Sequence, residues 1–181
     1  MPKVIKIAIT GPESTGKSMI SEQLANHYCT VWIPEFARYY LKKIDQPYDY
    51  DDILEIAKGQ VKSEEALMKL ANKVIFSDTE LLVTKIWCEI KYQKCHPWII
   101  QNFEKQDYDL YLLMNTDLPW QYDPLREHPE MLEELFRIYK NELEKHHLNY
   151  RIVSGIGGER LKNAIAFVNE VKPTNRKKIL V

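Results

Sequence analysis

Cysteine is scarce in this 181-residue chain, and long apolar runs are missing. The three cysteines, Cys29, Cys88 and Cys95, form no Cys-x-x-Cys pair, which argues against a disulfide framework and a cysteine-rich zinc site. No apolar stretch approaches the roughly 20 residues that a membrane-spanning helix needs. The first residues, MPKVIKIAIT, also lack the small-residue cleavage site of a secretory signal. We therefore expect a cytoplasmic protein with no membrane partner.

An excess of charge of one sign is also missing. The 25 Lys and Arg residues balance 26 Asp and Glu residues, so the net charge of -1 creates no global field that would collect nucleic acid. We expect the partner to be a small-molecule substrate at a local site, while the oligomeric state stays open. With 45% hydrophobic residues and only 6 glycines, the composition is typical of one globular domain with one core.

Short apolar runs rich in β-branched residues alternate with segments of helical spacing. The runs are too brief for stable helices and predict buried strands at residues 3–10, 29–33, 73–76, 109–114 and 150–153. Parallel strands need crossover helices, so we expect a three-layer α/β fold with a five-stranded parallel sheet flanked by helices. The domain is expected to cover residues 1–172, and the basic segment 173–181 is expected to be a solvated tail.

The segment GPESTGKS, residues 11–18, directly follows the first expected strand and fits G-x-x-x-x-G-K-[ST] at every specified position. Its glycines let backbone N–H groups point at phosphate oxygens beside the start of a helix. Lys17 would bridge the outer phosphates, and Ser18 would offer its hydroxyl to a magnesium ion. The motif predicts a P-loop NTPase fold that binds ATP and Mg²⁺. The residues expected to hold the nucleotide are Gly11, Glu13, Ser14, Thr15, Gly16, Lys17 and Ser18.

A second glycine-rich segment, GIGGER at residues 155–160, follows the last expected strand. Arg160 stands where a dinucleotide-binding motif has its third glycine, so a second Rossmann site is not expected. In small P-loop kinases this last loop borders the adenine, which makes Gly157 and Gly158 candidate contacts. The alternative is a plain strand-to-helix loop.

Motifs of GTPase switches are not satisfied elsewhere in the chain. Asn72-Lys73 is followed by Val74-Ile75 and so does not complete the guanine motif N-K-x-D. The chain is also too small for the additional helical lid domain of ring ATPases. A phosphoryl transferase of this size needs only positioning groups and charge around the phosphates, which favours a small kinase.

Asp78 ends an apolar strand, where a carboxylate can hold magnesium or its water beside the P-loop. The segment Ser77-Asp78-Thr79-Glu80 also fits a capping box for the next helix, and capping alone would explain the acid. Asp117, which follows the fourth expected strand, is a rival for the metal. We expect Ser18 and Asp78 to be the metal-side residues.

Glu35 follows the second expected strand, where open α/β sheets carry substrate-facing groups. A carboxylate there can accept the proton of a hydroxyl nucleophile. Arg38, one helical turn further, can hold Glu35 or a substrate oxygen. The alternative is an ordinary surface ion pair.

The segment of about residues 117–129 contains three prolines, two aromatic residues and one arginine, and predicts a closing lid. Arg126 is the candidate to stabilise transition-state charge, against the alternative of a solvated loop residue. Tyr39 and Trp87 are candidates to stack on a planar substrate, although aromatic residues are more often part of a core. The expected catalytic set is thus Lys17, Glu35, Asp78 and Arg126.

Five segments carry a further pattern, and they are GPESTGKS, PEFARYYL, FSDTELLVTKIW, QYDPLREHPE and SGIGGERLKNAI. Together they resemble the ribosylnicotinamide kinase domain of the NadR-type NAD-salvage proteins. The resemblance implies an ATP- and Mg²⁺-dependent kinase that phosphorylates the 5′-hydroxyl of nicotinamide riboside to give nicotinamide mononucleotide. It maps the family's Glu-aromatic-small-Arg element onto residues 35–38, its acidic strand end onto Asp78 and its lid arginine onto Arg126. Pro34 and Ala37 stand where the family has Trp and Gly.

The nucleotidyltransferase of the bifunctional proteins, marked by a His-x-Gly-His motif, has no counterpart here, so we expect a stand-alone kinase. Two other functions stay open at this point. One is a P-loop kinase for another nucleoside or small hydroxyl metabolite. The other is an ATP-dependent regulatory or binding protein.

Overall fold

The computed structural model describes residues 3–44, 46–124, 126–127 and 129–171. Its five strands form one sheet in the order β2-β3-β1-β4-β5, and every neighbouring pair is parallel. The strands are β1 (Ile5–Thr10), β2 (Trp32–Ile33), β3 (Val74–Asp78), β4 (Leu110–Met114) and β5 (Tyr150–Val153). This sheet confirms the expected α/β class.

Seven α-helices and one short 3₁₀-helix, Met68–Leu70, accompany the sheet in the described residues. The α-helices are α1 (Lys17–His27), α2 (Phe36–Ile44), α3 (Tyr50–Leu67), α4 (Leu81–Tyr92), α5 (Pro97–Lys105), α6 (Leu132–Lys145) and α7 (Gly158–Asn169). None of these helices is long and apolar enough to cross a membrane.

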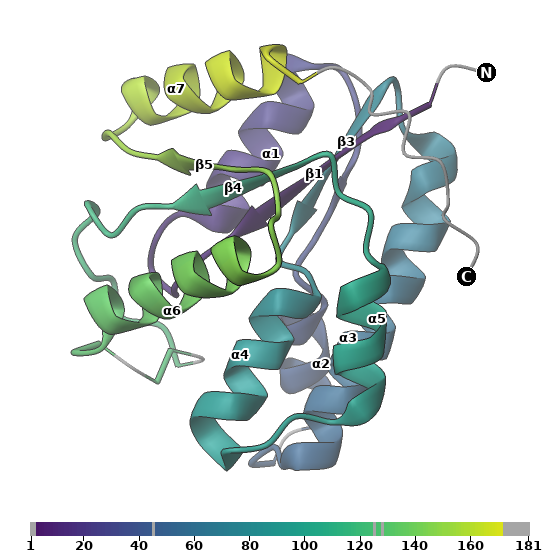
Figure 1. The fold of residues 1–181 in the computed structure, drawn as a ribbon, viewed down its shortest axis with the longest axis vertical. Helices are drawn as coiled ribbons and strands as arrows, with labels where there is room; N and C mark the ends of the chain where they lie inside the picture. Colours follow the sequence, from purple (N-terminus) through teal and green to yellow (C-terminus); the bar gives the residue numbers. More distant parts are fainter. Residues whose placement is uncertain (1–2, 45, 125, 128, 172–181) are drawn as a thin grey trace.

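The sheet is buried on both faces, which explains why its strands read as continuous apolar runs. Along β1, Ile7 and Ile9 pack with residues of α1 and α7, whereas Ala8 points to the opposite face and packs with residues of α3 to α6. Figure 1 shows the same arrangement, with α1 and α7 on one side of the sheet and α4, α5 and α6 on the other. The result is a three-layer fold.

Strand β2 is shorter than the sequence predicts. The backbone of Cys29 adopts a positive φ of 50°, and the Thr30 N–H donates to the Ala25 carbonyl at 2.9 Å, so the chain is still completing the end of α1. Pairing with β3 therefore begins only at Trp32.

Helix α5 was not expected from apolar spacing. It begins with Pro97, whose fixed φ suits the first helical position, and the Trp98 N–H donates to Nδ1 of His96 at 3.1 Å. His96 thus has a local capping role. The predicted tail, residues 173–181, and residue 172 lie outside the described residues, as do Leu125 and His128 of the predicted lid.

All five strands run in one direction, so their carboxyl ends meet at one edge of the sheet. Thr10, Ile33, Asp78, Met114 and Val153 end the strands there. Open α/β sheets bind ligands outside this edge, at the point where the strand order reverses. Strand β1, in the middle of the order, brings the segment 11–18 to that point.

Candidate functional site

A cavity of about 630 Å³ opens at the carboxyl edge of the sheet. Its walls come from the loop after β1, the first turns of α2, the middle of α4, the predicted lid and the loop after β5. Its volume is in the range of small-molecule sites, so one cavity can hold a ligand against all of these segments.

The loop after β1 has the conformation that its glycines predict. Gly11 has φ +124°, and a Cβ there would lie 3.1 Å from the Met114 carbonyl oxygen, so the loop passes too close to β4 for a side chain. Gly16 has φ +79° and immediately precedes α1, whose free N–H groups begin at this point. The Thr15 hydroxyl donates to the Pro12 carbonyl at 2.7 Å and closes the turn. The loop therefore forms a P-loop in front of a helix N-terminus.

Lys17 is the first residue of α1, and its side chain reaches back across the P-loop. Its Nζ donates to the carbonyls of Gly11 at 2.9 Å and Pro12 at 2.6 Å. Burial lowers the pKa of Lys17, while the nearby carboxylates of Glu35 and Asp78 oppose that shift. A buried ammonium group held by two neutral carbonyls can exchange them for stronger acceptors such as phosphate oxygens.

Asp78 ends β3 with a side chain that is almost completely buried. Its Oδ1 atom has no hydrogen-bond partner among the residues that the structure describes. Burial and then the charge of Glu35 raise the pKa of Asp78 to about 6, whereas a hydrogen bond with Ser18 and the charge of Lys17 lower it. Asp78 and Ser18 therefore place two oxygen atoms that could bind a cation next to each other, beside the P-loop lysine.

Helix capping does not explain Asp78. Helix α4 begins at Leu81, and its N-cap is Glu80, whose carboxylate accepts the Leu82 N–H. The other carboxylate oxygen of Glu80 accepts the Thr10 hydroxyl at 2.9 Å. Burial raises the pKa of Glu80 to about 7, against these hydrogen bonds. The alternative interpretation of residues 77–80 as a capping box is therefore wrong in its register, and the sequence pattern missed the separate role of Glu80.

Asp117, the rival metal residue, is already engaged. It forms an ion pair with Nη1 of Arg160, and its Oδ2 accepts the Gly155 N–H at 2.7 Å. Among the described residues, no group of three or more His, Cys, Asp or Glu side chains could hold a metal ion. Asp78 with Ser18 is thus the better candidate for a magnesium ion that is otherwise bound by phosphates and water.

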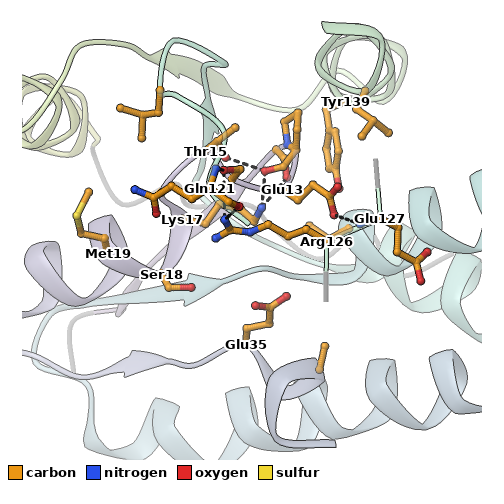
Figure 2. Close-up of a pocket in the computed structure, with 18 of the residues that line it drawn as sticks. Glu13, Thr15, Lys17, Ser18, Met19, Glu35, Gln121, Arg126, Glu127 and Tyr139 are labelled. Atoms are coloured by element: carbon orange, nitrogen blue, oxygen red, sulfur yellow. Dashed lines mark hydrogen bonds between the residues drawn. The ribbon is translucent and has the colours of Figure 1, made fainter. Parts of the chain in front are cut away.

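Glu35 lies on the side of the cavity opposite the P-loop. Figure 2 shows its carboxylate projecting from the start of α2 toward the side where Lys17 and Arg126 lie. Nε of Arg38 contacts Oε2 of Glu35 at 3.0 Å, and Nη1 of Arg38 contacts Oδ2 of Asp123 at 2.8 Å. The predicted Glu35–Arg38 contact is present, and it continues into the lid.

The segment predicted to be a lid contacts Glu13 and Ser14, two P-loop positions at which the motif specifies no residue type. The Gln121 N–H donates to Ser14 Oγ at 2.9 Å, and Nη1 of Arg126 contacts the same oxygen at 3.2 Å. The Glu127 N–H donates to Oε2 of Glu13 at 3.1 Å. Arg126 also donates to the Gln121 carbonyl. The lid arginine therefore lies within the cavity and beside the P-loop (Figure 2).

The wall of the cavity formed by α2 and α4 is largely apolar. Its apolar lining residues are Ala37, Leu41, Val83, Ile86, Trp87 and Ile90. The Trp87 indole N–H donates to the Tyr48 hydroxyl at 2.9 Å, and Tyr48 in turn donates to Glu127 at 2.7 Å. Trp87 therefore lies where a planar substrate could contact it.

Tyr39 lies outside the cavity, contrary to the sequence-based expectation. Residues 37, 38 and 41 of α2 line the cavity, and the helical turn directs residue 39 away from them. The Tyr39 side chain packs against Phe36 at a ring-centroid distance of 5.7 Å and stays 62% exposed. Its aromatic type alone did not indicate its direction.

The other end of the cavity has apolar residues that the sequence patterns did not single out. Met19, Leu118 and Ile156 line it together with Gly157. Met19 and Ile156 are 44% and 67% exposed, so both large apolar side chains are accessible to a ligand. Gly158 begins α7 and is not among the described lining residues. The signal in the sequence was an apolar residue in or directly next to each of these segments: Met19 follows the P-loop, Leu118 lies in the predicted lid and Ile156 lies in the second glycine-rich segment.

The chain matches a known protein family over most of its length. A family model described as an AAA domain matches residues 6–160. The trifunctional NAD biosynthesis/regulator protein NadR of Salmonella typhimurium (strain LT2) is 33% identical over 124 residues, and the protein of that name from Escherichia coli (strain K12) has the same identity over the same length. Each match covers 66% of this chain and 30% of the relative. The chain thus matches less than a third of the length of these relatives.

Solved structures show the same fold. A crystal structure of NadR protein in complex with NR has a TM-score of 0.82 at 20% identity and covers 98% of this chain and 52% of that one. A deoxyadenosine kinase from M. mycoides with products bound has a TM-score of 0.64 at 15% identity and covers 92% of this chain and 100% of that one. These likenesses confirm the predicted P-loop fold and the predicted resemblance to NadR.

Proposed function

The chain belongs to the family described as an AAA domain, and from this premise we propose that it is an ATP- and Mg²⁺-dependent kinase that phosphorylates the 5′-hydroxyl of nicotinamide riboside to give nicotinamide mononucleotide. One observation carries the proposal: a single cavity joins a complete P-loop to the Glu35–Arg38 pair and the lid arginine. The likeness to NadR supports nicotinamide riboside as the acceptor.

The proposed reaction transfers one phosphoryl group. The acceptor hydroxyl oxygen forms a bond to the γ-phosphorus of ATP, the bond between that phosphorus and the bridging oxygen breaks, and ADP leaves. Glu35 accepts the proton of the hydroxyl or orients it, because its carboxylate faces the P-loop side across the cavity. Arg38 keeps that carboxylate in place through the 3.0 Å contact.

The P-loop provides the charge that holds the phosphates. Lys17 would leave the carbonyls of Gly11 and Pro12 for the outer phosphates of ATP, and the N-terminus of α1 adds N–H donors. Arg126 contacts Ser14 at the edge of the P-loop, and from this side of the cavity its guanidinium would stabilise charge on the γ-phosphate.

Ser18 and Asp78 would hold the magnesium ion. The Oδ1 atom of Asp78, which is buried and has no partner within the described part of the chain, lies next to a serine hydroxyl and fits a hard cation that prefers oxygen donors. When bound, the ion neutralises charge on the β- and γ-phosphates.

The lid would exclude water during transfer. Residues 121, 126 and 127 contact the P-loop, and Asp123 contacts Arg38 on the opposite side of the cavity. A lid that spans both sides would keep the γ-phosphate from reacting with water instead of the acceptor.

A substrate panel tests the proposal. ADP release would be measured with ATP, Mg²⁺ and, in turn, nicotinamide riboside, deoxyadenosine, thymidine and no acceptor, with the Lys17→Ala variant as the control for background. We expect ADP release to depend on nicotinamide riboside and to be lost in Lys17→Ala. If ADP release depended only on another nucleoside, that nucleoside would replace nicotinamide riboside as the proposed acceptor. If no acceptor changed the rate of ADP release, a regulatory ATP-binding protein would be favoured.

A further inference from the structure

We propose that Arg160 is a positioning residue that aligns two loops for one nucleotide, with Asp117 as its counter-ion. The first is the P-loop, and the second is the loop after β5, residues 154–157, which is expected to border the base and is called the base-binding loop below. The inference rests on the proposed function, because it concerns how the same site binds ATP. Arg160 lies in the segment GIGGER after β5, at the third position of α7.

Stabilisation of α7 does not explain why an arginine occurs at position 160. Cations stabilise the C-terminal end of a helix, whereas Arg160 puts a positive charge in the first turn. Its side chain is also completely buried, and removing a guanidinium from water is unfavourable unless most of its donors are satisfied. Both Nη groups of Arg160 have partners, whereas its Nε has none among the described residues. The partners of its donors therefore indicate what the residue does.

Those partners come from three loops at the edge of the sheet. Nη2 donates to the carbonyls of Thr15 in the P-loop at 3.0 Å and of Asn115 after β4 at 2.8 Å. Nη1 donates to the Gly155 carbonyl after β5 at 2.9 Å and to the Asp117 carboxylate. One planar group with fixed donor directions thus connects segments that are up to 145 residues apart in the chain.

The contact with Thr15 orients a phosphate-binding N–H. In a trans peptide the carbonyl and the following N–H point in opposite directions. Arg160 holds the Thr15 carbonyl on the side of α7, so the N–H of Gly16 is directed to the other side. That N–H belongs to the last P-loop residue before α1.

The contact with Gly155 does the same for the base-binding loop. Arg160 holds the carbonyl of Gly155, while Oδ2 of Asp117 accepts its N–H at 2.7 Å. Gly155 has φ +103°, and a Cβ there would lie 3.3 Å from the Arg160 backbone nitrogen. Both peptide groups of Gly155 are therefore fixed, and the next residues, Ile156 and Gly157, line the cavity.

Arg160 and Asp117 thus form a frame behind the cavity that joins the two loops. Neither residue is among the described residues that line the cavity, so the effect on the nucleotide is indirect. The frame should matter most for a ligand that uses both loops at once, because such a ligand gains from their fixed relative position.

Calorimetric titration of the folded protein tests this proposal without turnover. The probes are AMP-PNP with Mg²⁺, which has both base and phosphates, and tripolyphosphate with Mg²⁺, which has no base. The variants are Arg160→Lys, which keeps the charge but loses the fork of donors, and Asp117→Asn, which removes the ion pair but keeps the shape. Lys6→Met is the matched control, since Lys6 is a largely buried cation with ion pairs of 2.6 Å to Glu64 and Asp107, near the start of β1 and away from the cavity.

We expect Arg160→Lys to weaken AMP-PNP binding by about tenfold, the scale of one lost hydrogen bond to a charged group, and to weaken tripolyphosphate binding less. Asp117→Asn should also weaken AMP-PNP binding more than tripolyphosphate binding. This second variant keeps the test valid if Arg160→Lys does not fold. Lys6→Met should lower Tm and leave both affinities unchanged.

The inference would be overturned if the variants fold and bind AMP-PNP as tightly as the wild type. It would also be overturned if their affinities for AMP-PNP and for tripolyphosphate fall by the same factor. A wild-type protein that binds neither probe would instead overturn the proposed function, and this inference with it.

Discussion

At the scale of single residues, acidic side chains near the P-loop differ in their surroundings and so in their chemistry. Glu35 faces the cavity and pairs with Arg38. Asp78 is buried, and its Oδ1 atom has no hydrogen-bond partner among the described residues. Glu80 is buried, and its carboxylate accepts the Thr10 hydroxyl and the Leu82 N–H at the start of α4. The pKa of Asp78 is raised to about 6 and that of Glu80 to about 7, in both cases chiefly by burial. These differences agree with the proposed roles of Glu35 as proton acceptor and Asp78 as metal-side residue, whereas Glu80 caps α4.

Replacing Glu35 with Gln should lower kcat by roughly 10²-fold, the usual contribution of a positioned acid or base. ATP binding should stay near that of the wild type, because Glu35 lies across the cavity from the P-loop. Steady-state kinetics and nucleotide titration measure the two effects. Glu55→Gln is the matched control, since Glu55 also pairs with a cation three residues later, at 2.7 Å on the outside of α3. A Glu35→Gln enzyme with the kcat of that control would make Glu35 structural.

Replacing Glu80 with Gln should change how stability depends on pH. The folded pKa of about 7 lies above the ordinary value of 4.5, so the unfolded chain releases this proton first as the pH rises. The wild type should therefore lose free energy of unfolding between about pH 4.5 and 7, with a slope of at most about 1.4 kcal/mol per pH unit from this group. Relative to the wild type, Glu80→Gln should become progressively more stable over that range.

Denaturant unfolding at pH 5, 6, 7 and 8 measures this difference. Glu142→Gln provides the contrast, because its ion pairs with Lys85 and Lys145 lower the pKa of Glu142, and its stabilising contribution is lost only when the pH falls. A constant difference between Glu80→Gln and the wild type across the four pH values would contradict the burial argument.

At the scale of elements, the sequence predicted best what local chemistry determines. The spacing of residues 11–18 predicted the P-loop, and short apolar runs predicted all five strands. It failed at the bounds of β2, which is cut short by the turn at Cys29, and at the start of α4, whose capping residue is Glu80. Tyr39 was wrongly expected in the cavity because the sequence does not say which side of α2 faces it.

The segment proposed to be the lid makes contacts on opposite sides of the cavity. Asp123→Ala removes its ion pair with Arg38 and should let water reach the γ-phosphate more often. We expect the ratio of ATP hydrolysed to acceptor phosphorylated to rise about 2- to 5-fold, the scale of one partly exposed ion pair. Asp107→Ala, which removes a 2.6 Å ion pair with Lys6 outside the cavity, should leave that ratio unchanged. An unchanged ratio in Asp123→Ala would show that this contact does not close the lid.

At the scale of the whole molecule, the parallel sheet explains why residues from distant parts of the chain share one cavity. The alternation of strands and helices predicted a parallel sheet, but the order β2-β3-β1-β4-β5 and the junction of three loops at Arg160 are long-range properties. Individual residue types do not reveal such pairings, because each depends on how two or more crossovers pack together. The sequence accordingly suggested Asp117 as a rival for the metal rather than as the partner of Arg160.

Nucleotide binding should stabilise the whole molecule, because a ligand that binds only the folded state shifts the unfolding equilibrium. At an ATP concentration of 100 times Kd with Mg²⁺ present, the gain is about 2.7 kcal/mol, which corresponds to a rise in Tm of about 5–10 °C for a domain of this size. Thermal unfolding followed by circular dichroism measures the shift. The shift should be small in Lys17→Ala, and an equal shift in that variant would place the nucleotide away from the P-loop.

The most direct test of the account is the identity of the product formed from nicotinamide riboside, ATP and Mg²⁺, determined by mass spectrometry with fragmentation. We predict nicotinamide riboside carrying one added phosphoryl group on its 5′-oxygen, formed in step with ADP and not formed by Lys17→Ala. Unmodified nicotinamide riboside alongside accumulating ADP, or a phosphoryl group on another position, would contradict it.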